Sequence, residues 1–260
     1  MLKHLTLAAL ATSSLAILMP SVVAAQSAKP PVTVVLVHGA WADGSSWNRV
    51  IPLLQAKGIK VLIVQNPTTS LADDVAATER VLADATGPVV LVGHSWGGTV
   101  ITQAGMDPKV AALVYVSAFG NKAGQSDGEL VAAYAKPPAL GAISDDGHGY
   151  LRLTEAGVVE DFAPDLPLED ARTMAVTQTP LASATFGEKV TDAAWKTKPS
   201  WFVISANDRV IDPQMERDAA HWMNAKTTIL KSSHVSLLSH PSEVAAVIED
   251  AVSTVAAKAQ

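Results

Sequence analysis

The stretch GHSWGG, residues 93–98, places a serine between glycines directly after an apolar run, residues 89–92. The run is rich in valine and suits a buried strand, and the residues after it are typical of a helix. A serine in G-x-S-x-G between a strand and a helix lies on a sharp turn with its hydroxyl exposed. The N–H groups at the start of the helix favour negative charge developing nearby. Ser95 is therefore the candidate nucleophile.

A serine hydroxyl needs a general base, and the base needs a group that orients it. On this strand–turn–helix arrangement the base is a histidine that follows both the serine and the acid in the chain. His234 fits best, because it follows an apolar stretch, residues 228–230, and lies just before the last predicted helix. His240 is the alternative, but it precedes Pro241 and is typical of a helix start. The other histidines lie in the leader, in turn motifs, in the middle region and inside a helix: His4, His38, His94, His148 and His221.

Three aspartates compete for the role of the orienting acid. Asp208 follows the strand-like run at residues 201–205 and precedes His234 by 26 residues. Asp212 stands before Pro213 and is typical of a helix cap. Asp127 follows the preceding strand and ranks third. The position of Asp208 at a strand end favours it as the acid.

An oxyanion intermediate needs two N–H donors. One is expected from Trp96, the residue after the nucleophile, and the other from Ala40, in the loop after the first strand. A tight turn at His38-Gly39 would point the N–H of Ala40 inward, although the same pair also suits a plain strand-ending turn. We expect His38, Gly39 and Trp41 of this loop to line the substrate pocket. Apolar residues of the middle region, among them Tyr134, favour an acyl or aromatic substrate group, and ordinary packing explains them equally well.

Strand-like and helix-like segments alternate along the chain, which predicts an α/β fold: a doubly wound, mostly parallel sheet with helices on both faces. The predicted strands are residues 33–37, 61–64, 89–92, 110–116 and 201–204. The predicted helices are residues 47–57, 70–85, 99–106, 213–224 and 241–258.

Residues 119–198 interrupt this alternation. They are rich in Gly, Pro, Asp and Ala and contain no strand-like apolar run. We expect a mainly helical insertion, with helices near residues 125–135 and 167–177, that forms a lid over the carboxyl edge of the sheet. A surface insertion without function is the alternative.

The N-terminus has the pattern of a secretory signal peptide. Lys3 precedes an apolar run, residues 5–19, and small residues at 23–25 suit cleavage before Gln26. The apolar run is shorter than the roughly 20 residues that span a bilayer. We therefore expect residues 1–25 to be removed, residues 26–260 to form one domain, and the protein to be periplasmic or secreted without a stable membrane anchor.

The amino-acid composition excludes several other classes of site and partner. The chain has no cysteine, which excludes disulfides, thiolate metal sites and a cysteine nucleophile. Its formal net charge is −6 and it has no basic cluster, so nucleic acid is not an expected partner.

The motifs LVHGAW, LVGHSWGG, SANDRVID and SSHVSLLSHP together resemble the α/β-hydrolase superfamily along nearly the whole mature chain. The similarity is greatest to the branch of esterases and hydroxynitrile lyases that includes plant methylesterases. The resemblance implies Ser95 as nucleophile, Asp208 as acid, His234 as base, and Ala40 and Trp96 as oxyanion donors. It also implies a lid, and neither a cofactor nor a metal.

Two positions separate this chain from the lyases it resembles. The lyases usually carry Thr at the position of Gly39 and Lys at the position of Val235. We therefore expect hydrolysis of a small, largely apolar ester or lactone. Perhydrolase-like or cyanohydrin-cleaving activity at the same residues, and a non-catalytic ligand-binding role, are the alternatives.

Overall fold

The computed structural model describes residues 31–258, and its main element is a six-stranded sheet in the order β2-β1-β3-β4-β8-β9. All neighbouring strands of this sheet are parallel. The strands are β1 (Thr33–Val37), β2 (Lys60–Val64), β3 (Val89–Ser95), β4 (Val110–Ala118), β8 (Ser200–Ser205) and β9 (Lys226–Leu230). The predicted parallel sheet is confirmed.

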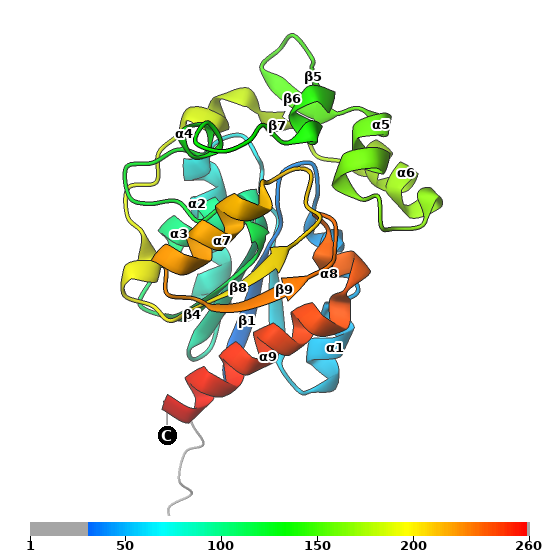
Figure 1. Ribbon diagram of the computed structural model, residues 1–260. Coiled ribbons are helices and arrows are strands. Elements are labelled where there is room, and N and C mark those ends of the chain that lie inside the picture. Colours follow the sequence, from blue (N-terminus) through cyan, green and yellow to red (C-terminus); the bar gives the residue numbers. More distant parts are fainter. Residues whose placement is uncertain (1–30, 259–260) are drawn as a thin grey trace, which may run out of the picture.

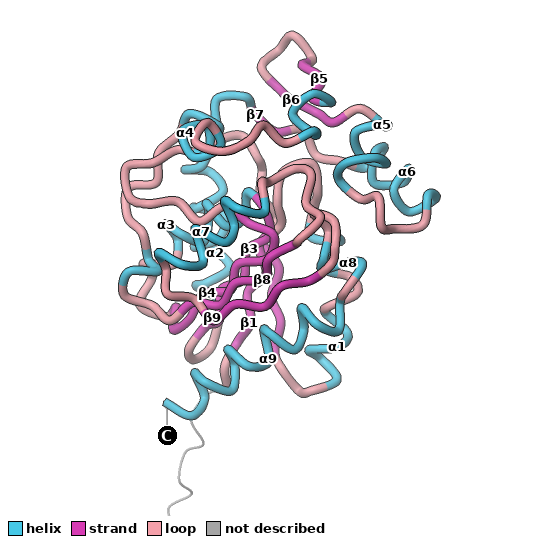
Figure 2. The backbone as a smooth tube through the Cα atoms, in the orientation of Figure 1, coloured by secondary structure: helices cyan, strands magenta, loops and turns pink. Residues whose placement is uncertain are grey.

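Helices cover both faces of the sheet, as Figures 1 and 2 show. Helix α9 packs on one face and contacts α1, while α2, α3 and α7 lie on the other face. Their bounds are α1 (Ile51–Ala56), α2 (Leu71–Asp84), α3 (Trp96–Ala104), α7 (Pro213–Trp222) and α9 (Pro241–Lys258), with the short helices η1 (Gly44–Trp47) and α8 (Ser236–Ser239). The chain is therefore a doubly wound α/β protein.

Strand composition follows position in the sheet. Every residue of β1 and β3 is buried, because these central strands are covered on both faces, and their apolar runs reflect this. The edge strands β2 and β9 begin at exposed lysines and are only partly buried. Two predicted helices begin at the expected caps: the Ser70 side chain accepts from the N–H of Asp73, and the Asp212 side chain accepts from that of Gln214.

Strand order brings distant loops together at the carboxyl edge. Strand β1 pairs with β3, with Val37 opposite Gly93, so the loop after β1 lies beside Ser95. Strand β8 pairs with β9, with Ser205 opposite Leu230, so the loop carrying Asp208 lies beside the one carrying His234. In open parallel sheets ligands bind at such carboxyl edges, where the strand order changes direction.

Residues 119–199, between β4 and β8, form the β4–β8 segment, whose elements α4 to α6 and β5 to β7 lie at the top of Figure 1. Its helices are α4 (Asp127–Val131), η2 (Pro138–Ala142), α5 (Glu155–Gly157), η3 (Val158–Phe162), α6 (Leu168–Thr177), η4 (Ser183–Gly187) and η5 (Ala194–Lys196). Helix α4 is shorter than the helix expected near residues 125–135, whereas α6 closely matches the second expected helix.

Besides the helices expected of a mainly helical insertion, this segment contains a small antiparallel sheet that the sequence did not predict. Its strands are β5 (Ile143–Asp145), β6 (Tyr150–Leu153) and β7 (Leu181–Ala182). These strands hold two to four residues each, and β5 and β6 also contain polar residues, so no strand is long enough to give a local apolar signal. Pairing between distant residues forms them instead.

The expected signal peptide, residues 1–25, lies outside the described residues. Among residues 31–258, none of the helices combines the length and the apolar character needed to cross a membrane.

Candidate active site

Ser95 stands at the end of β3 in a backbone conformation that few residues adopt. Its φ of 53° and ψ of −123° lie outside the regions open to ordinary residues, and the next residue begins helix α3. A Cβ at Gly97 would lie 2.7 Å from the carbonyl oxygen of Val37, so the turn accommodates only glycine there. The structure therefore has the sharp strand–turn–helix geometry that the sequence motif predicts.

The loop after β1 packs directly against this turn. A Cβ at Gly39 would lie 2.7 Å from the Cβ of Ser95, so glycine permits the approach. The buried His38 is held by its own hydrogen bonds: its Nε2 accepts from the N–H of Asn66 at 2.9 Å, and its Nδ1 donates to the carbonyl of Gly39 at 2.8 Å. Burial lowers the pKa of His38, so its ring is neutral and stabilises the turn.

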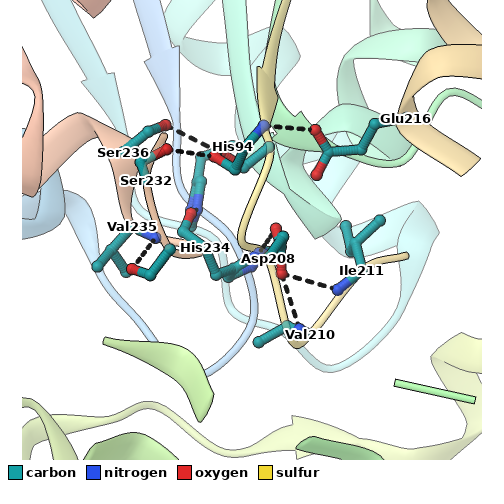
Figure 3. Close-up of polar contacts among 12 residues, drawn as sticks. His94, Asp208, Val210, Ile211, Glu216, Ser232, His234, Val235 and Ser236 are labelled. Carbon is teal, nitrogen blue, oxygen red and sulfur yellow. Dashed lines mark hydrogen bonds and ion pairs between the residues drawn. The ribbon is translucent and has the colours of Figure 1, made fainter. Parts of the chain in front are cut away.

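His234 and Asp208 form a buried pair. The Nδ1 of His234 donates to Oδ2 of Asp208 at 2.6 Å, and both side chains are 0% exposed. Oδ1 of Asp208 accepts from the N–H groups of Val210 at 2.7 Å and Ile211 at 2.9 Å, which fixes the carboxylate (Figure 3). The Nε2 of His234 is buried without a partner among the described residues, so it is free to accept a proton.

The alternative candidates for the acid and the base make other contacts. Asp212 caps α7, and the Nδ1 of His240 is hydrogen-bonded to the hydroxyl of Ser239 at 2.9 Å. Neither residue contacts the His234–Asp208 pair through a hydrogen bond between described residues. Asp127 lies beside Ser95 rather than beside His234, in the cavity described below.

Two aromatic rings hold the His234 imidazole. The ring centroid of Phe162 is 5.0 Å away and that of His94 is 4.8 Å away. The Nε2 of His94 is 3.0 Å from the carbonyl oxygen of His234 and donates to it. Burial, followed by the nearby His234, lowers the pKa of His94 well below its usual value, so this ring stays neutral. Phe162 is one of the apolar residues of the middle region that the sequence associates with a substrate group or with ordinary packing, but its contact with His234 has no local signal.

A small cavity adjoins Ser95. Ala40, Trp41 and Trp96 line it beside the serine, and Leu140, Leu181 and Phe186 of the β4–β8 segment also line it. Its volume of about 20 Å³ holds about one water molecule. A cavity of this size is too small for a carboxylic ester, and side chains of this segment form part of its wall.

Ala40 and Trp96, the expected oxyanion donors, both line the cavity with Ser95. Trp96 is the first residue of α3, where a backbone N–H has no acceptor within the helix. A hydrogen bond fixes its indole ring, because Nε1 donates to Oδ2 of Asp74 at 2.6 Å. Burial raises the pKa of Asp74 to about 6. The indole of Trp96 thus both packs in the core and borders the cavity.

Trp41 connects the loop after β1 to the β4–β8 segment. Its φ is 56°, and its Nε1 donates to the carbonyl of Leu151 in β6 at 3.0 Å. Tyr134, which we expected in the pocket, does not line the cavity beside Ser95. It lines a neighbouring surface groove that shares Leu140 and Phe186 with this cavity, and its hydroxyl donates to Asp218 at 2.9 Å.

Two aspartates of the β4–β8 segment hold the loops that carry the acid and the base. Oδ1 of Asp161 pairs with Arg209, the residue after Asp208, at 2.7 Å. Oδ2 of Asp165 accepts from the N–H of Ser233, the residue before His234, at 2.8 Å. These contacts join positions 48 and 68 residues apart, so no local pattern in the sequence could have found them.

A buried polar cluster lies behind the pair. The hydroxyl of Ser205 is 2.6 Å from that of Ser117 and 2.9 Å from that of Ser232. The backbone N–H of Ser205 donates to Oε2 of Glu216 at 2.9 Å (Figure 3). Burial, followed by the charge of Asp208, raises the pKa of Glu216 well above its usual value. Burial and the charge of Asp208 thus both favour the protonated form of Glu216.

The described residues contain no group of three or more His, Asp or Glu side chains arranged to hold a metal ion. The reactive groups of the candidate site are a serine hydroxyl, an imidazole, a carboxylate and backbone N–H groups.

Comparison with known proteins identifies relatives along most of the chain. A model of the alpha/beta hydrolase family matches residues 34–247. A probable hydrolase of Phoma sp. is 27% identical over 201 residues, which cover 70% of this chain and 80% of that protein. A carbendazim hydrolyzing esterase of Nocardioides sp. is 34% identical over 124 residues, which cover 42% of this chain and 50% of that protein.

Solved structures share the fold. A pyrethroid hydrolase from Sphingobium faniae superimposes with a TM-score of 0.72 at 24% identity, covering 85% of this chain and 98% of its own. A methylesterase from Arabidopsis superimposes with a TM-score of 0.69 at 22% identity, covering 86% and 99%. The second of these belongs to the group of plant methylesterases that the sequence motifs resemble.

Proposed function

The chain belongs to the alpha/beta hydrolase family, and we propose that it cleaves carboxylic esters or lactones through Ser95, His234 and Asp208. The observation that carries this proposal is the buried hydrogen bond from His234 to Asp208, which leaves the Nε2 of His234 unpartnered. This bond fixes the tautomer in which Nε2 accepts a proton, as a general base requires.

In the proposed reaction His234 Nε2 takes the proton of Ser95 while Oγ of Ser95 attacks the substrate carbonyl carbon. The carbonyl oxygen becomes an oxyanion, and the N–H groups of Ala40 and Trp96 donate to it. The carbon–oxygen bond to the alcohol then breaks, and His234 returns the proton to the leaving oxygen. Water, deprotonated by His234, attacks the acyl-enzyme and releases the carboxylic acid and free Ser95. Asp208 stabilises the imidazolium in both steps.

Three further features support this assignment. Ser95 has the positive φ that exposes a hydroxyl at the end of a strand. Ala40 and Trp96 share a cavity with Ser95. The two hydrogen bonds from Val210 and Ile211 hold the carboxylate of Asp208, so its free oxygen faces the imidazole.

Esters are the proposed substrate class for two reasons. The cavity beside Ser95 is lined mostly by apolar side chains, which suits a small uncharged acyl group. The relative from Nocardioides sp. that matches this chain at 34% identity is an esterase. In this proposal the β4–β8 segment acts as the lid, because its side chains close the cavity.

Hydrolysis of short p-nitrophenyl esters by the protein tests the proposal. We expect Ser95→Ala and His234→Ala to reduce turnover by several orders of magnitude. A fluorophosphonate probe should label the parent protein and leave Ser95→Ala unlabelled. Equal hydrolysis by Ser95→Ala and the parent would overturn the proposal. Faster reaction of hydrogen peroxide with acetate than ester hydrolysis would instead favour perhydrolase activity.

We also propose that the protein acts outside the cytoplasm, after removal of residues 1–25. The support is the charged start, the apolar run and the small residues before Gln26.

A further inference from the structure

One carboxyl group in the cavity beside Ser95 is not used by the proposed mechanism. Asp127, the first residue of α4, lines this cavity and is 0% exposed. It is the one acidic or basic residue among those that line the cavity. A lone carboxyl among apolar walls is the feature that gives binding pockets their selectivity.

The two oxygens of Asp127 are used unequally. Oδ1 accepts from the hydroxyl of Thr99 at 2.8 Å and from the side-chain amide of Asn121 at 2.7 Å. Oδ2 is buried and has no hydrogen-bond partner among the described residues. Asp127 also forms no ion pair with a described lysine, arginine or histidine. Burial raises its pKa to about 7, against the opposing effect of its two hydrogen bonds.

A second buried aspartate, Asp74, has hydrogen-bond partners for both of its carboxyl oxygens. Both oxygens of Asp74 are hydrogen-bonded, one to the indole of Trp96 at 2.6 Å and the other to the N–H of Thr68 at 2.8 Å. Asp127 therefore differs from Asp74, because its Oδ2 has no partner among the described residues. Leaving a buried acceptor unpaired destabilises a protein, so such an atom is expected to have a partner in the functional state.

We propose that Asp127 is a specificity-determining residue of the acyl pocket, and that its Oδ2 accepts a hydrogen bond from a hydroxyl or amino group on the acyl chain. Preferred substrates are then short carboxylic esters or lactones whose acyl part carries such a donor. The inference rests on the proposed function of Ser95. The bond forms within the pocket that Trp41, Phe119 and Phe186 close, where little water competes for Oδ2.

The first test compares methyl esters in pairs of equal carbon number, with hydrolysis followed in a pH-stat. Methyl butyrate is compared with its 2-hydroxy, 3-hydroxy and 3-amino derivatives. We expect kcat/KM for at least one substituted ester to exceed that of methyl butyrate by about 10-fold or more, the range expected when a buried polar group gains its partner. Hydroxyl and amino donors are distinguished by which derivative gains.

The second test uses variants of the carboxyl group. Asp127→Asn and Asp127→Leu should bring the ratio of substituted to plain ester close to 1 while methyl butyrate is still hydrolysed. Asp212→Asn is the matched control, because it removes a carboxylate from a helix start outside the cavity, and it should leave the ratio unchanged. If the Asp127 variants do not fold, the ratios measured with the parent protein decide the question.

Two kinds of failure are distinguishable. Ser95-dependent hydrolysis of methyl butyrate, with no substituted ester preferred, would refute the role of Asp127 and leave the proposed function intact. An absence of Ser95-dependent hydrolysis of all esters and of fluorophosphonate labelling would refute the proposed function, and the role of Asp127 with it.

Discussion

Asp165 accepts hydrogen bonds from both the backbone N–H and the hydroxyl of Ser233, the residue directly before His234. The loop that carries the proposed base is therefore held by a carboxylate from the β4–β8 segment rather than only by its own strand. The position of the imidazole depends on residues far away in the sequence, and this dependence can be measured.

Replacing Asp165 by Ala should lower kcat for ester hydrolysis by up to about 30-fold, since the two lost hydrogen bonds to the loop are worth roughly 1 kcal/mol each. KM should change less, because Asp165 does not line the cavity beside Ser95. Steady-state kinetics measure both. Glu155→Ala, which removes an exposed carboxylate paired with Arg172 in the same segment, is the control. A loss of equal size in Glu155→Ala would show that the effect is not specific to the Ser233 loop.

Asp208→Asn should lower kcat by about 10³- to 10⁴-fold, because an amide no longer fixes the tautomer of His234 or stabilises its imidazolium. The variant is expected to fold, since Asn can still accept from the N–H groups of Val210 and Ile211. Single-turnover kinetics with circular dichroism as a folding check provide the measurement. Asp212→Asn should retain parental kcat, and similar losses in both variants would argue against Asp208 as the acid.

Trp96→Phe should destabilise the protein more at pH 8 than at pH 5. The indole N–H donates to Asp74, whose pKa burial raises to about 6, so the carboxylate is charged at pH 8 and largely protonated at pH 5. Losing a donor to the buried charged form costs about 1–3 kcal/mol, whereas the cost of the smaller ring is independent of pH. Urea unfolding of both proteins at both pH values gives the difference. Equal destabilisation at pH 5 and pH 8 would contradict this expectation.

Buried acids should make the protein less stable as the pH rises from about 4 to 8. The folded-state pKa values of Asp74, Asp127 and Glu216 are all raised, to about 6, to about 7 and well above the usual value. In this range the folded state retains protons that the unfolded state releases. The free energy of unfolding therefore falls with pH, and each unit of pKa shift corresponds to about 1.4 kcal/mol.

Glu216→Gln should reduce this pH dependence, because Gln cannot ionise and its carbonyl can still accept from the N–H of Ser205. We expect the variant to lose less stability than the parent between pH 5 and pH 8.5 in urea unfolding. Identical slopes in the two proteins would show that Glu216 does not contribute to the dependence.

If residues 1–25 are a signal peptide, as we propose, expression of residues 1–260 should yield a mature protein that begins at Gln26. Intact-mass measurement of the exported protein tests this expectation, and Ala25→Arg should block the cleavage, because small residues are required there. An exported protein that keeps residues 1–25 would indicate a retained leader.

Local patterns predicted the parts of the fold that depend on local order. The buried strands around Val35 and Leu91 are continuous apolar runs, and Ser70 and Asp212 cap helices where their types predict. The pairing of Asp208 with His234 followed from both residues standing at the ends of strands that turned out to be neighbours. The sequence predicts this pairing well because β8 and β9 are consecutive in the chain and also neighbours in the sheet.

The remaining features depend on contacts between distant residues. Phe162 and Asp165 approach His234 and Ser233 only after the β4–β8 segment folds back on the sheet. Glu216 lies in helix α7, and no sequence motif surrounds it. The short strand β6 pairs on both sides, but it is too short for an alternation of apolar and polar residues to predict it as a strand. Tertiary packing determines these positions, so single-sequence reasoning could not find them.

The pairing of β8 with β9 also determines when the protein can become active. Asp208 and His234 meet only after β9, the last strand, has added to the edge of the sheet. Any chain that ends before residue 226 lacks the proposed base, whatever else it has folded. Ester hydrolysis would therefore report completed synthesis and folding, and a growing chain would remain inert towards esters until its C-terminal strand has docked.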